Sequence, residues 1–224
     1  MVLSMHAEKT ANILDFKQSR DILQTYSIQL PEFEVARTQN DIMQLSKKIG
    51  YPLSMKIVSP DITHKSDVGG VETNVNNNKD AAEAYARILQ NIKKNKLGAR
   101  ITGVLIQKMF SGTEIIIGMK RDKQFGPVIL FGLGGIFVEI MQDVAMRIAP
   151  VKLDDAIEMI KEIKAYPILK GARGTKPADI RKIAEIIIKV SELSMKEESI
   201  NEIDLNPIII DGKEINIVDI RIIK

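Results

Sequence analysis

The sequence predicts an α+β protein with two lobes, and two changes of pattern along the chain carry that prediction. Up to about Asn91, segments whose apolar residues recur at helical spacing alternate with short apolar strands. After Gly98, strand-like segments follow one another, two helical segments come next, and the chain closes on a hairpin. We therefore expect an N-terminal lobe over residues 1–104 and a C-terminal lobe over residues 105–224, joined near Gly103 to Met109.

The first lobe is predicted as helix, strand, helix, strand, loop, strand and helix. Pro31 and Gly50 interrupt the helical patterns, and Asn40 or Asp41 can cap the second helix. The expected helices cover residues 7–26, 41–49 and 78–91, the strands cover 33–35, 53–58 and 71–75, and a polar loop covers 59–70.

The second lobe is predicted as antiparallel strands backed by helices. Ser111-Gly112 and Asp122 lie at turns between successive strands, and Asp211-Gly212 is typical of a hairpin turn. The expected strands cover residues 104–108, 114–120, 127–131, 203–210 and 215–220, and the helices cover 154–163 and 178–193.

Composition places the chain among soluble globular proteins. It has 224 residues, of which 45% are hydrophobic and 27% charged, which is enough for two small lobes that share a cleft. No apolar run approaches the ~20 residues that span a bilayer, and Met1 to Thr10 lacks the apolar core of a signal peptide. The absence of cysteine excludes disulfides and thiolate chemistry and fits a reducing cytoplasm, so we expect a cytoplasmic protein without a membrane partner.

The charge pattern argues against nucleic-acid binding. The net charge of +3 is small, and the densest basic stretch, Lys93 to Lys96, ends a predicted helix, where cations suit the helix dipole. Nucleic-acid binders concentrate basic residues and interleave aromatic ones, which here make up only 4% of the chain.

Lys56 is the first residue that indicates chemistry, because it stands within the apolar strand Leu53 to Val58. A buried ammonium is costly unless it is paired, so Lys56 either extends along an open face or reaches a phosphate. The loop Ser59 to Gly70 favours the phosphate, because Gly69 and Gly70 let backbone amides close on an anion. The competing interpretation of this loop is a surface turn.

His64, in the same loop, is a candidate nucleophile or proton carrier. An imidazole can be neutral near pH 7 and can carry a phosphoryl group or a proton. A lone histidine is more often structural, but His64 lies among polar residues rather than on an apolar helix face. His6, in the terminal arm, is interpreted as incidental.

Two other segments of the chain are rich in glycine. Gly132 to Phe137 is similar to the dinucleotide fingerprint, but Phe137 replaces its last glycine and no βαβ unit follows, so a Rossmann site is rejected. The chain also lacks the P-loop motif. Gly171 to Gly174, flanked by Lys170 and Lys176, either holds a phosphate or connects two helices.

The terminal hairpin carries hard oxygen ligands. Period-two alternation puts Glu202, Asp204 and Asn206 on one face of a strand, and Asp219 on the partner strand can join them. One or two carboxylates and an amide suit Mg²⁺, which keeps waters and substrate phosphates as its other ligands. The alternative is a solvated strand face.

Four segments together carry a resemblance to a known family. They run from Gly50 to Pro60, from His64 to Val71, from Phe125 to Gly135 and from Glu202 to Pro207. In these segments, and in their order along the chain, the sequence resembles the β subunits of ADP-forming acetyl-CoA synthetases (acetate–CoA ligases), which have the ATP-grasp fold. The resemblance covers nearly the whole chain from about Phe16. One departure is Ser27, where the family usually has a glycine before the isoleucine.

The resemblance implies a nucleotide, ATP or ADP with Mg²⁺, in a cleft between the two lobes. His64 would relay a phosphoryl group to ADP, and Lys56 would hold the nucleotide phosphates. The nucleotide-binding residues that it implies are Lys56, Gly69, Gly70, Gln107, Lys108, Met109, Phe110, Glu114, Gly134, Gly135 and Arg147. The metal ligands that it implies are Asp204, Asn206 and Asp219.

The same resemblance implies a partner. An α subunit would bind CoA and carry the first phosphohistidine, commonly in an α2β2 heterotetramer, since these residues hold no CoA-binding half. The reaction would interconvert acyl-CoA, ADP and phosphate with free acid, CoA and ATP. The alternatives are a β-type subunit of a succinate–CoA ligase, and a nucleotide-sensing module that does not transfer phosphate.

Overall fold

The computed structural model describes residues 12–62, 64–135, 142–172 and 176–224, which form two compact units. The smaller unit is Pro31–Phe110, and the larger one combines the chain up to Leu30 with Ser111–Lys224. This division differs from the expected lobes of residues 1–104 and 105–224 in two ways: the chain up to Leu30 belongs to the larger unit, and the smaller unit extends to Phe110. The strand that ends at Lys108 belongs wholly to the smaller sheet, and the first helix packs beside a C-terminal strand of the larger one.

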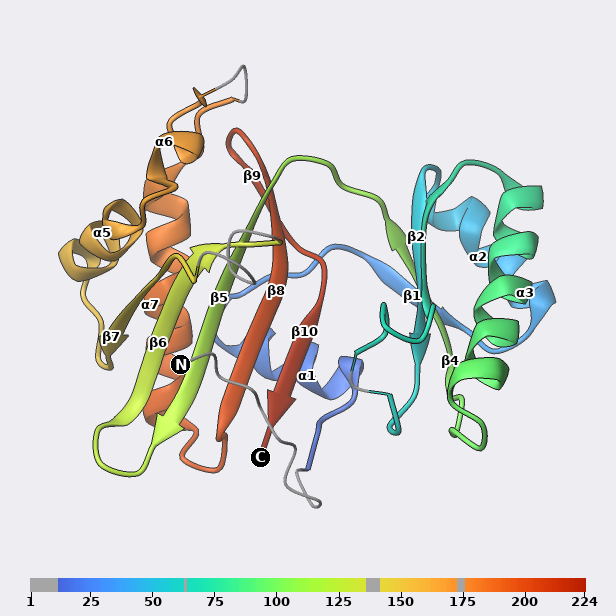
Figure 1. Cartoon of the computed structure of the whole chain (residues 1–224), viewed down its shortest axis with the longest axis horizontal. Helices are drawn as coiled ribbons and strands as arrows, with labels where there is room; N and C mark the ends of the chain where they lie inside the picture. The colour runs from blue at the N-terminus through green and yellow to red at the C-terminus, as the bar shows by residue number, and fades with distance from the viewer. Residues whose placement is uncertain (1–11, 63, 136–141, 173–175) are drawn as a thin grey trace. The chain divides into compact units, whose positions relative to one another are not determined.

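The smaller unit is a four-stranded antiparallel sheet with two helices on one face (Figure 1). Its strand order is β1-β4-β2-β3. The elements are β1 (Phe33–Ala36), α2 (Gln39–Ile49), β2 (Leu53–Val58), β3 (Val71–Val75), α3 (Asn78–Asn95) and β4 (Gly103–Lys108). Met55, Ile57 and Ile106 lie in the core between the sheet and the two helices.

Both helices of the smaller unit begin at polar caps. Thr38 caps α2 and forms a capping box with Asp41, so the expected cap at Asn40 or Asp41 was wrong by a few residues. Asn77 caps α3, whose buried residues Ala81, Ala84, Ile88 and Ile92 recur at helical spacing.

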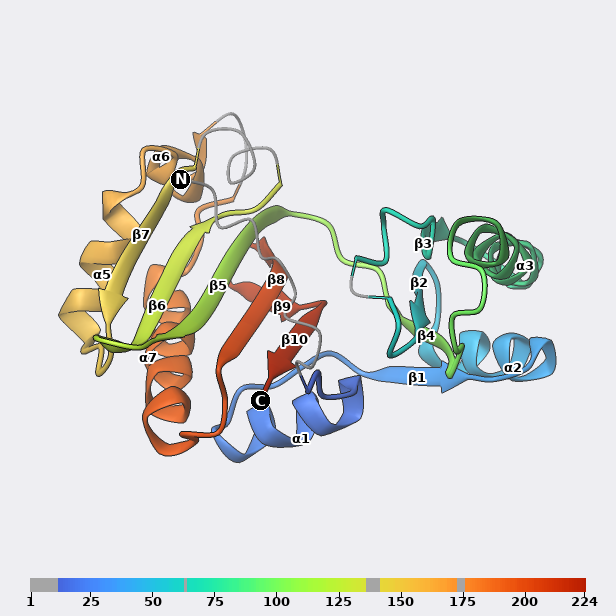
Figure 2. The same ribbon diagram turned by 60° about the horizontal axis from the view of Figure 1, so that its bottom comes forward.

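The larger unit is a six-stranded antiparallel sheet covered on one face by α5 and α7 (Figure 2). Its strands follow the order β10-β8-β5-β6-β7, and β9 pairs with β8. The elements are α1 (Phe16–Thr25), β5 (Thr113–Asp122), β6 (Gly126–Leu133), β7 (Val144–Ile148), α5 (Leu153–Glu162), α6 (Tyr166–Leu169), α7 (Ile180–Lys196), β8 (Glu202–Asp211), β9 (Glu214–Ile217) and β10 (Ile220–Ile223).

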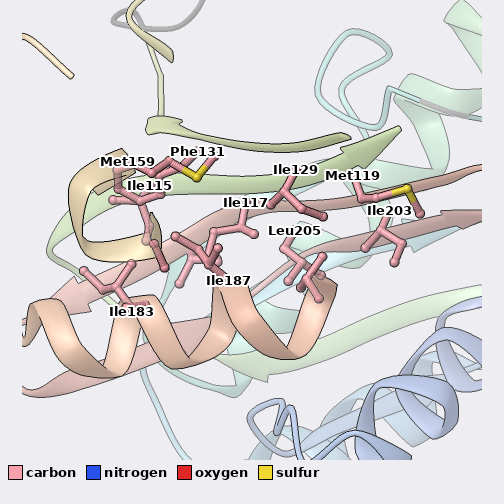
Figure 3. Close-up of a cluster of buried hydrophobic side chains, with 14 of the residues drawn as sticks. Ile115, Ile117, Met119, Ile129, Phe131, Met159, Ile183, Ile187, Ile203 and Leu205 are labelled. Atoms are coloured by element: carbon pink, nitrogen blue, oxygen red, sulfur yellow. The ribbon is translucent and has the colours of Figure 1, made fainter. Parts of the chain in front are cut away.

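The core of the larger unit lies between this sheet and its helices. Figure 3 shows Ile115 and Ile117 of β5 beside Ile183 and Ile187 of α7, with Phe131 of β6 nearby. All five side chains are fully buried. The alternate residues of these strands therefore lie on the opposite face, which α5 and α7 leave uncovered.

The first helix is shorter than the sequence predicts. It begins at Phe16, because Asp15 accepts from the Gln18 amide and makes a capping box with that residue. Residues 12–14 instead run beside β10, where the Leu14 amide donates to the Ile222 carbonyl at 3.0 Å. Residues 1–11, including His6, lie outside the described residues.

The terminal hairpin is also more divided than expected. The predicted strand over residues 215–220 is two strands, β9 and β10, with a break at Val218 and Asp219. Pro207 stands opposite the break and lacks an amide proton, so the regular ladder cannot continue there. The strand β7 and the short helix α6 were not predicted. In the described ranges, no helix is both long and apolar enough to cross a membrane.

Candidate functional site

Lys56 lies in the middle of the smaller sheet with only 7% of its surface exposed. Met55 and Ile57 face the helix-covered core, so strand alternation turns Lys56 to the other face. Leu105 of β4 and Val71 of β3 are its direct cross-strand neighbours. The sheet thus holds an ammonium group that has apolar cross-strand neighbours and is largely shielded from solvent, unlike a solvated surface lysine.

Gln107 shares that face of the smaller sheet. It stands opposite Ser54 on β2, two positions from Lys56, and is 2% exposed. Since neighbouring residues on one face of a sheet lie within side-chain reach, the structure brings together two of the predicted nucleotide contacts, Lys56 and Gln107.

The predicted hinge residues after Gln107 are tied to the turn before β2. The Lys108 ammonium donates to the Tyr51 carbonyl at 2.7 Å, and the Met109 amide donates to the Pro52 carbonyl at 2.9 Å. The Met109 sulfur accepts from the Asn74 amide. Lys108 therefore has a structural partner, while Phe110 is the last residue of the smaller unit.

The loop after β2 uses its two glycines differently from the prediction. The Gly70 amide donates to the Lys65 carbonyl at 2.7 Å, and the Gly69 amide donates to the Ser66 carbonyl at 3.0 Å. In this conformation neither amide is available to a phosphate. The glycines have a packing reason instead, because a Cβ at Gly70 would lie 2.5 Å from Ile57 and Gly69 has a φ of +69°.

His64 is exposed at the start of this loop, beside a small cavity of about 230 Å³. Asp61, Asp67 and Lys96 also line the cavity. Hydrogen bonds from the side chain and amide of Arg100 lower the pKa of Asp61, so that carboxylate has its own partner. The imidazole is thus open to a reactant, with groups of both charges around it.

In the larger unit, Glu114 lies against the glycine pair that follows β6, Gly134 and Gly135. The Gly134 amide donates to the Glu114 carbonyl at 2.8 Å. A Cβ on Gly134 would lie 2.8 Å from the Glu114 Cβ, and one on Gly135 would lie 3.7 Å from its Oε2. The structure therefore brings Glu114, Gly134 and Gly135 together, and Glu114 itself is exposed.

The predicted metal ligands also lie close together. Asp204 and Asn206 alternate with Ile203 and Leu205, which face the core, so both belong to the uncovered face. The Asn206 amide donates to the Asp219 carbonyl at 3.2 Å across the break between β9 and β10. The Asp204 side chain is 33% exposed, and Asn206 is exposed.

Their oxygen atoms suit a hard cation, although the described residues contain no group of three His, Cys, Asp or Glu side chains close enough to hold a metal. Mg²⁺ takes one or two carboxylates and completes its shell with water and phosphate oxygens, and Asp204 and Asp219 are two such carboxylates. The Asn206 amide oxygen can serve as a further ligand.

Arg221 is a charged neighbour of this group that the sequence analysis missed. It stands directly opposite Asp204 on β10 and pairs with Glu202 at 2.6 Å. A signal was present in the sequence, since Arg221 follows Asp219 by two positions and alternation puts both on one face.

Arg147 does not join the predicted nucleotide contacts. It stands opposite Ile129, a core residue, and so lies on the helix-covered face of the larger sheet. Its guanidinium pairs with Glu162 at the end of α5, with a nitrogen–oxygen distance of 2.6 Å. Its neighbour Met146 stands opposite Leu130 on the other face. The structure therefore gives no support to Arg147 as a nucleotide contact, and that role stays a prediction.

The basic glycine loop keeps its two interpretations. Residues 173–175 of this loop lie outside the described residues. Lys176 pairs with Asp211 at 2.9 Å, which ties this end of the loop to the hairpin turn and raises the pKa of Lys176.

Comparison with models of protein families shows which family the chain belongs to. The model of the ATP-grasp domain family matches residues 5–223. The chain therefore belongs to the ATP-grasp family, whose enzymes bind a nucleotide, and the fold expected from the sequence is confirmed.

A curated relative narrows this class. The chain is 52% identical over 207 residues to the β subunit of acetate–CoA ligase [ADP-forming] I of Pyrococcus furiosus, and the match covers 92% of this chain and 89% of the relative. The chain thus belongs among the β subunits of the ADP-forming acetate–CoA ligases and is a subunit of an ADP-forming acyl-CoA synthetase.

Two solved structures of acetyl-coenzyme A synthetase 1 from Candidatus Korarchaeum cryptofilum are similar to this chain. One, in complex with coenzyme A, Ca-AMPCP and HgCl⁺, has a TM-score of 0.91 and 42% identity, covering 94% of this chain and 93% of that one. The other, with coenzyme A and Mg-AMPPCP, has its phosphohistidine segment pointing towards the nucleotide binding site. Its TM-score is 0.79 at 40% identity, covering 94% and 91% of the two chains.

Proposed function

We propose that His64 takes a phosphoryl group from a phosphohistidine of a partner α subunit and passes it to ADP bound by this chain. The observation that carries this proposal is Lys56, an ammonium held at 7% exposure on the face of the smaller sheet that its helices leave uncovered. The phosphates of a nucleotide are anions that an ammonium group at this position can bind.

The nucleotide contacts are proposed residue by residue. Lys56 binds nucleotide phosphates, and the segment from Gln107 to Phe110 borders the adenine. Glu114 accepts hydrogen bonds from the ribose hydroxyls, and Gly134 and Gly135 let the backbone approach the phosphates. The contact of these glycines with Glu114 supports this assignment, because a side chain at Gly134 would collide with it.

Mg²⁺ is the proposed metal, and Asp204, Asn206 and Asp219 would hold it. Bound there, Mg²⁺ supplies positive charge that neutralises the phosphate oxygens during transfer. The chain's own residues do the positioning: the carboxylates and the amide oxygen fix one end of the phosphate chain, and Lys56 balances its charge.

The transfer balances without a further reactant. A neutral nitrogen of His64 attacks phosphorus, a new phosphorus–nitrogen bond forms, and the bond to the donor histidine breaks. An oxygen of the ADP β-phosphate then attacks the same phosphorus and releases the His64 imidazole, giving ATP. Both steps are reversible, so the chain can also start from ATP.

The partner is an α subunit that binds CoA and forms the acyl phosphate, in an α2β2 heterotetramer. The relative's designation as a β subunit supports a partner, and the phosphohistidine segment of the solved relative supports its chemistry. The co-substrates ADP and acyl-CoA make the cytoplasm the expected compartment.

The test mixes this chain with its α subunit, acetyl-CoA, ADP, Mg²⁺ and ³²P-phosphate, and follows label into protein and into ATP. Wild type, His64→Ala and the loop control Ser66→Ala are compared. We expect label in ATP from wild type and Ser66→Ala, and none from His64→Ala. Formation of ATP at the wild-type rate by His64→Ala would refute the relay. Nucleotide binding without ATP from any variant would favour a sensing module.

A further inference from the structure

The loop that carries His64 is bonded to one face of helix α3. The Asn91 Nδ2 donates to the Gly69 carbonyl at 3.0 Å, and the Asn95 Nδ2 donates to the Val68 carbonyl at 3.2 Å. Residues four apart lie on the same face of a helix. One row of side chains on α3 therefore binds two consecutive carbonyls of the loop.

Two ion pairs fasten the chain on either side of His64 to the same part of the smaller unit. Arg100, which follows α3, donates to the Asp61 carboxylate from its amide at 2.7 Å and from its guanidinium at 3.1 Å. Arg87, one turn before Asn91 on α3, donates to Glu72 of β3 at 3.1 and 3.0 Å. His64 lies between these two pairs along the chain.

Asn91 is the best shielded of these four anchors. The side chains of Arg100 and Arg87 are 77% and 50% exposed, and an ion pair that water can reach contributes little. Asn95 is exposed as well, whereas Asn91 is half-buried. A hydrogen bond that is partly shielded from water costs more to lose, because its carbonyl is then left without a partner.

Gly69 is fitted to this contact. A Cβ at Gly69 would lie 2.7 Å from the Asn91 Nδ2 and 3.0 Å from the Asn91 Cβ, so only a glycine lets the carboxamide lie against the backbone. The Gly69 amide meanwhile donates to the Ser66 carbonyl at 3.0 Å. This glycine therefore closes the loop through its amide and joins the loop to α3 through its carbonyl.

We infer that Asn91 is a positioning residue for His64, an inference that rests on the relay proposed above. The bond from Asn91 to the Gly69 carbonyl holds the loop in the conformation in which the imidazole accepts and passes on the phosphoryl group. Phosphoryl transfer needs donor, imidazole and acceptor in line, and a displacement of about 1 Å can cost about 100-fold in rate. Asn91 acts through the loop and not on the reacting atoms.

Amide hydrogen exchange of the full chain tests the anchor without partner or ligand. In Asn91→Leu, the Gly69 and Gly70 amides should exchange about tenfold faster, because the loop opens more easily, while the amides of α2 keep their wild-type rates. Asn91→Asp keeps the shape of the side chain and removes the donor, so it should act in the same direction. Gln90→Leu removes an exposed carboxamide from the same helix and should change nothing.

Two outcomes of the exchange experiment would overturn the anchor. One is wild-type exchange of the loop amides in both Asn91→Leu and Asn91→Asp. The other is equal acceleration in α2, which would mean that Asn91 stabilises the whole smaller unit and not the loop in particular.

Steady-state kinetics then test the effect on transfer. With the α subunit, acetyl-CoA, phosphate and Mg²⁺, Asn91→Leu should lower kcat for ATP formation by about tenfold and leave the KM for ADP within about twofold of wild type. The kcat is calculated per folded protein, measured by circular dichroism, so partial unfolding does not imitate the result. Gln90→Leu should match wild type.

His64→Ala separates this inference from the proposed function. If His64→Ala forms ATP at the wild-type rate, the relay fails and the role of Asn91 in it fails too, although hydrogen exchange still reports the anchor. If His64→Ala forms no ATP and Asn91→Leu keeps the wild-type kcat, the relay stands and the positioning role of Asn91 is overturned.

Discussion

The two sheets of this protein are built alike, but the polar residues on their uncovered faces differ in exposure to solvent. Each has one face packed under helices and one face that carries polar candidates. In the smaller unit those candidates, Lys56 and Gln107, are buried at 7% and 2% exposure. In the larger unit Asp204 is 33% exposed and Asn206 lies in solvent.

The difference follows from what each face is proposed to bind. A buried lysine is a preorganised cation, which attracts phosphate strongly because little water competes for it. Mg²⁺ keeps part of its water shell, so its ligands need access to solvent rather than a closed cage. Under the proposed function, the smaller unit supplies a fixed charge and the larger unit supplies metal ligands that solvent can reach.

The largest expected effect tests the helix-packed face of the larger sheet. Phe131→Ala should lower the free energy of unfolding by about 3–5 kcal/mol, because a fully buried aromatic ring is replaced by a cavity. Chemical denaturation measures the loss, and hydrogen exchange reports where it falls. If amide exchange becomes faster only in the larger unit, the two units are separate in stability. If exchange in the smaller unit becomes faster by the same factor, the division into two units is contradicted.

The second prediction tests the buried cation. Lys56→Met keeps the length of the side chain and removes its charge, so ADP affinity in Mg²⁺ should fall by about 100-fold. The thermal stability of the variant must stay close to that of wild type for this comparison to report binding. Calorimetry and thermal unfolding check both.

Lys94→Met is the matched control for Lys56→Met, because Lys94 is an exposed lysine on α3. It should leave ADP affinity at the wild-type value. If Lys56→Met also binds ADP like wild type, the burial of Lys56 has a packing reason and the contrast between the two faces fails.

The smallest expected effect concerns backbone strain at the end of α1. Ser27 has a φ of 57°, a left-handed conformation that costs a residue with a Cβ more than glycine. Ser27→Gly should therefore raise the free energy of unfolding by about 0.5–1 kcal/mol, with ADP affinity unchanged. The hydrogen bond from the Lys189 ammonium to the Ser27 carbonyl should remain, because Ser27 contributes only its backbone to that bond.

Ser27→Ala is the control for this glycine, because it keeps the Cβ and loses only the hydroxyl. It should give no gain in stability. A gain equal to that of Ser27→Gly would mean that the hydroxyl, rather than the left-handed backbone, is responsible.

Much of the site could be predicted because its residues follow local rules. The strand around Lys56 and the acid strand from Glu202 both show an alternation that fixes which side chains share a face. The structure agrees on the faces of the strand, with Ile203 and Leu205 in the core and Asp204 on the opposite face. The roles assigned to these residues remain predictions.

The expectations that the structure does not support share a different cause. Arg147 was expected from the family resemblance, its strand β7 was not predicted, and only the register with Ile129 shows which face it occupies. Gly69 and Gly70 looked like an anion-binding nest, but their amides close the loop on Ser66 and Lys65. Each depends on a partner whose position the local sequence does not specify.

By itself, the sequence determined the α+β class, most of the elements and the residue types available for phosphate and metal chemistry, because these depend on periodicity and on short-range turn preferences. Only the tertiary structure decided that the first helix joins the C-terminal strands, that the last strand breaks opposite Pro207, and that Arg221 stands beside Asp204. Those outcomes depend on pairing between segments far apart in the chain, where a shift of one residue turns a side chain to the other face.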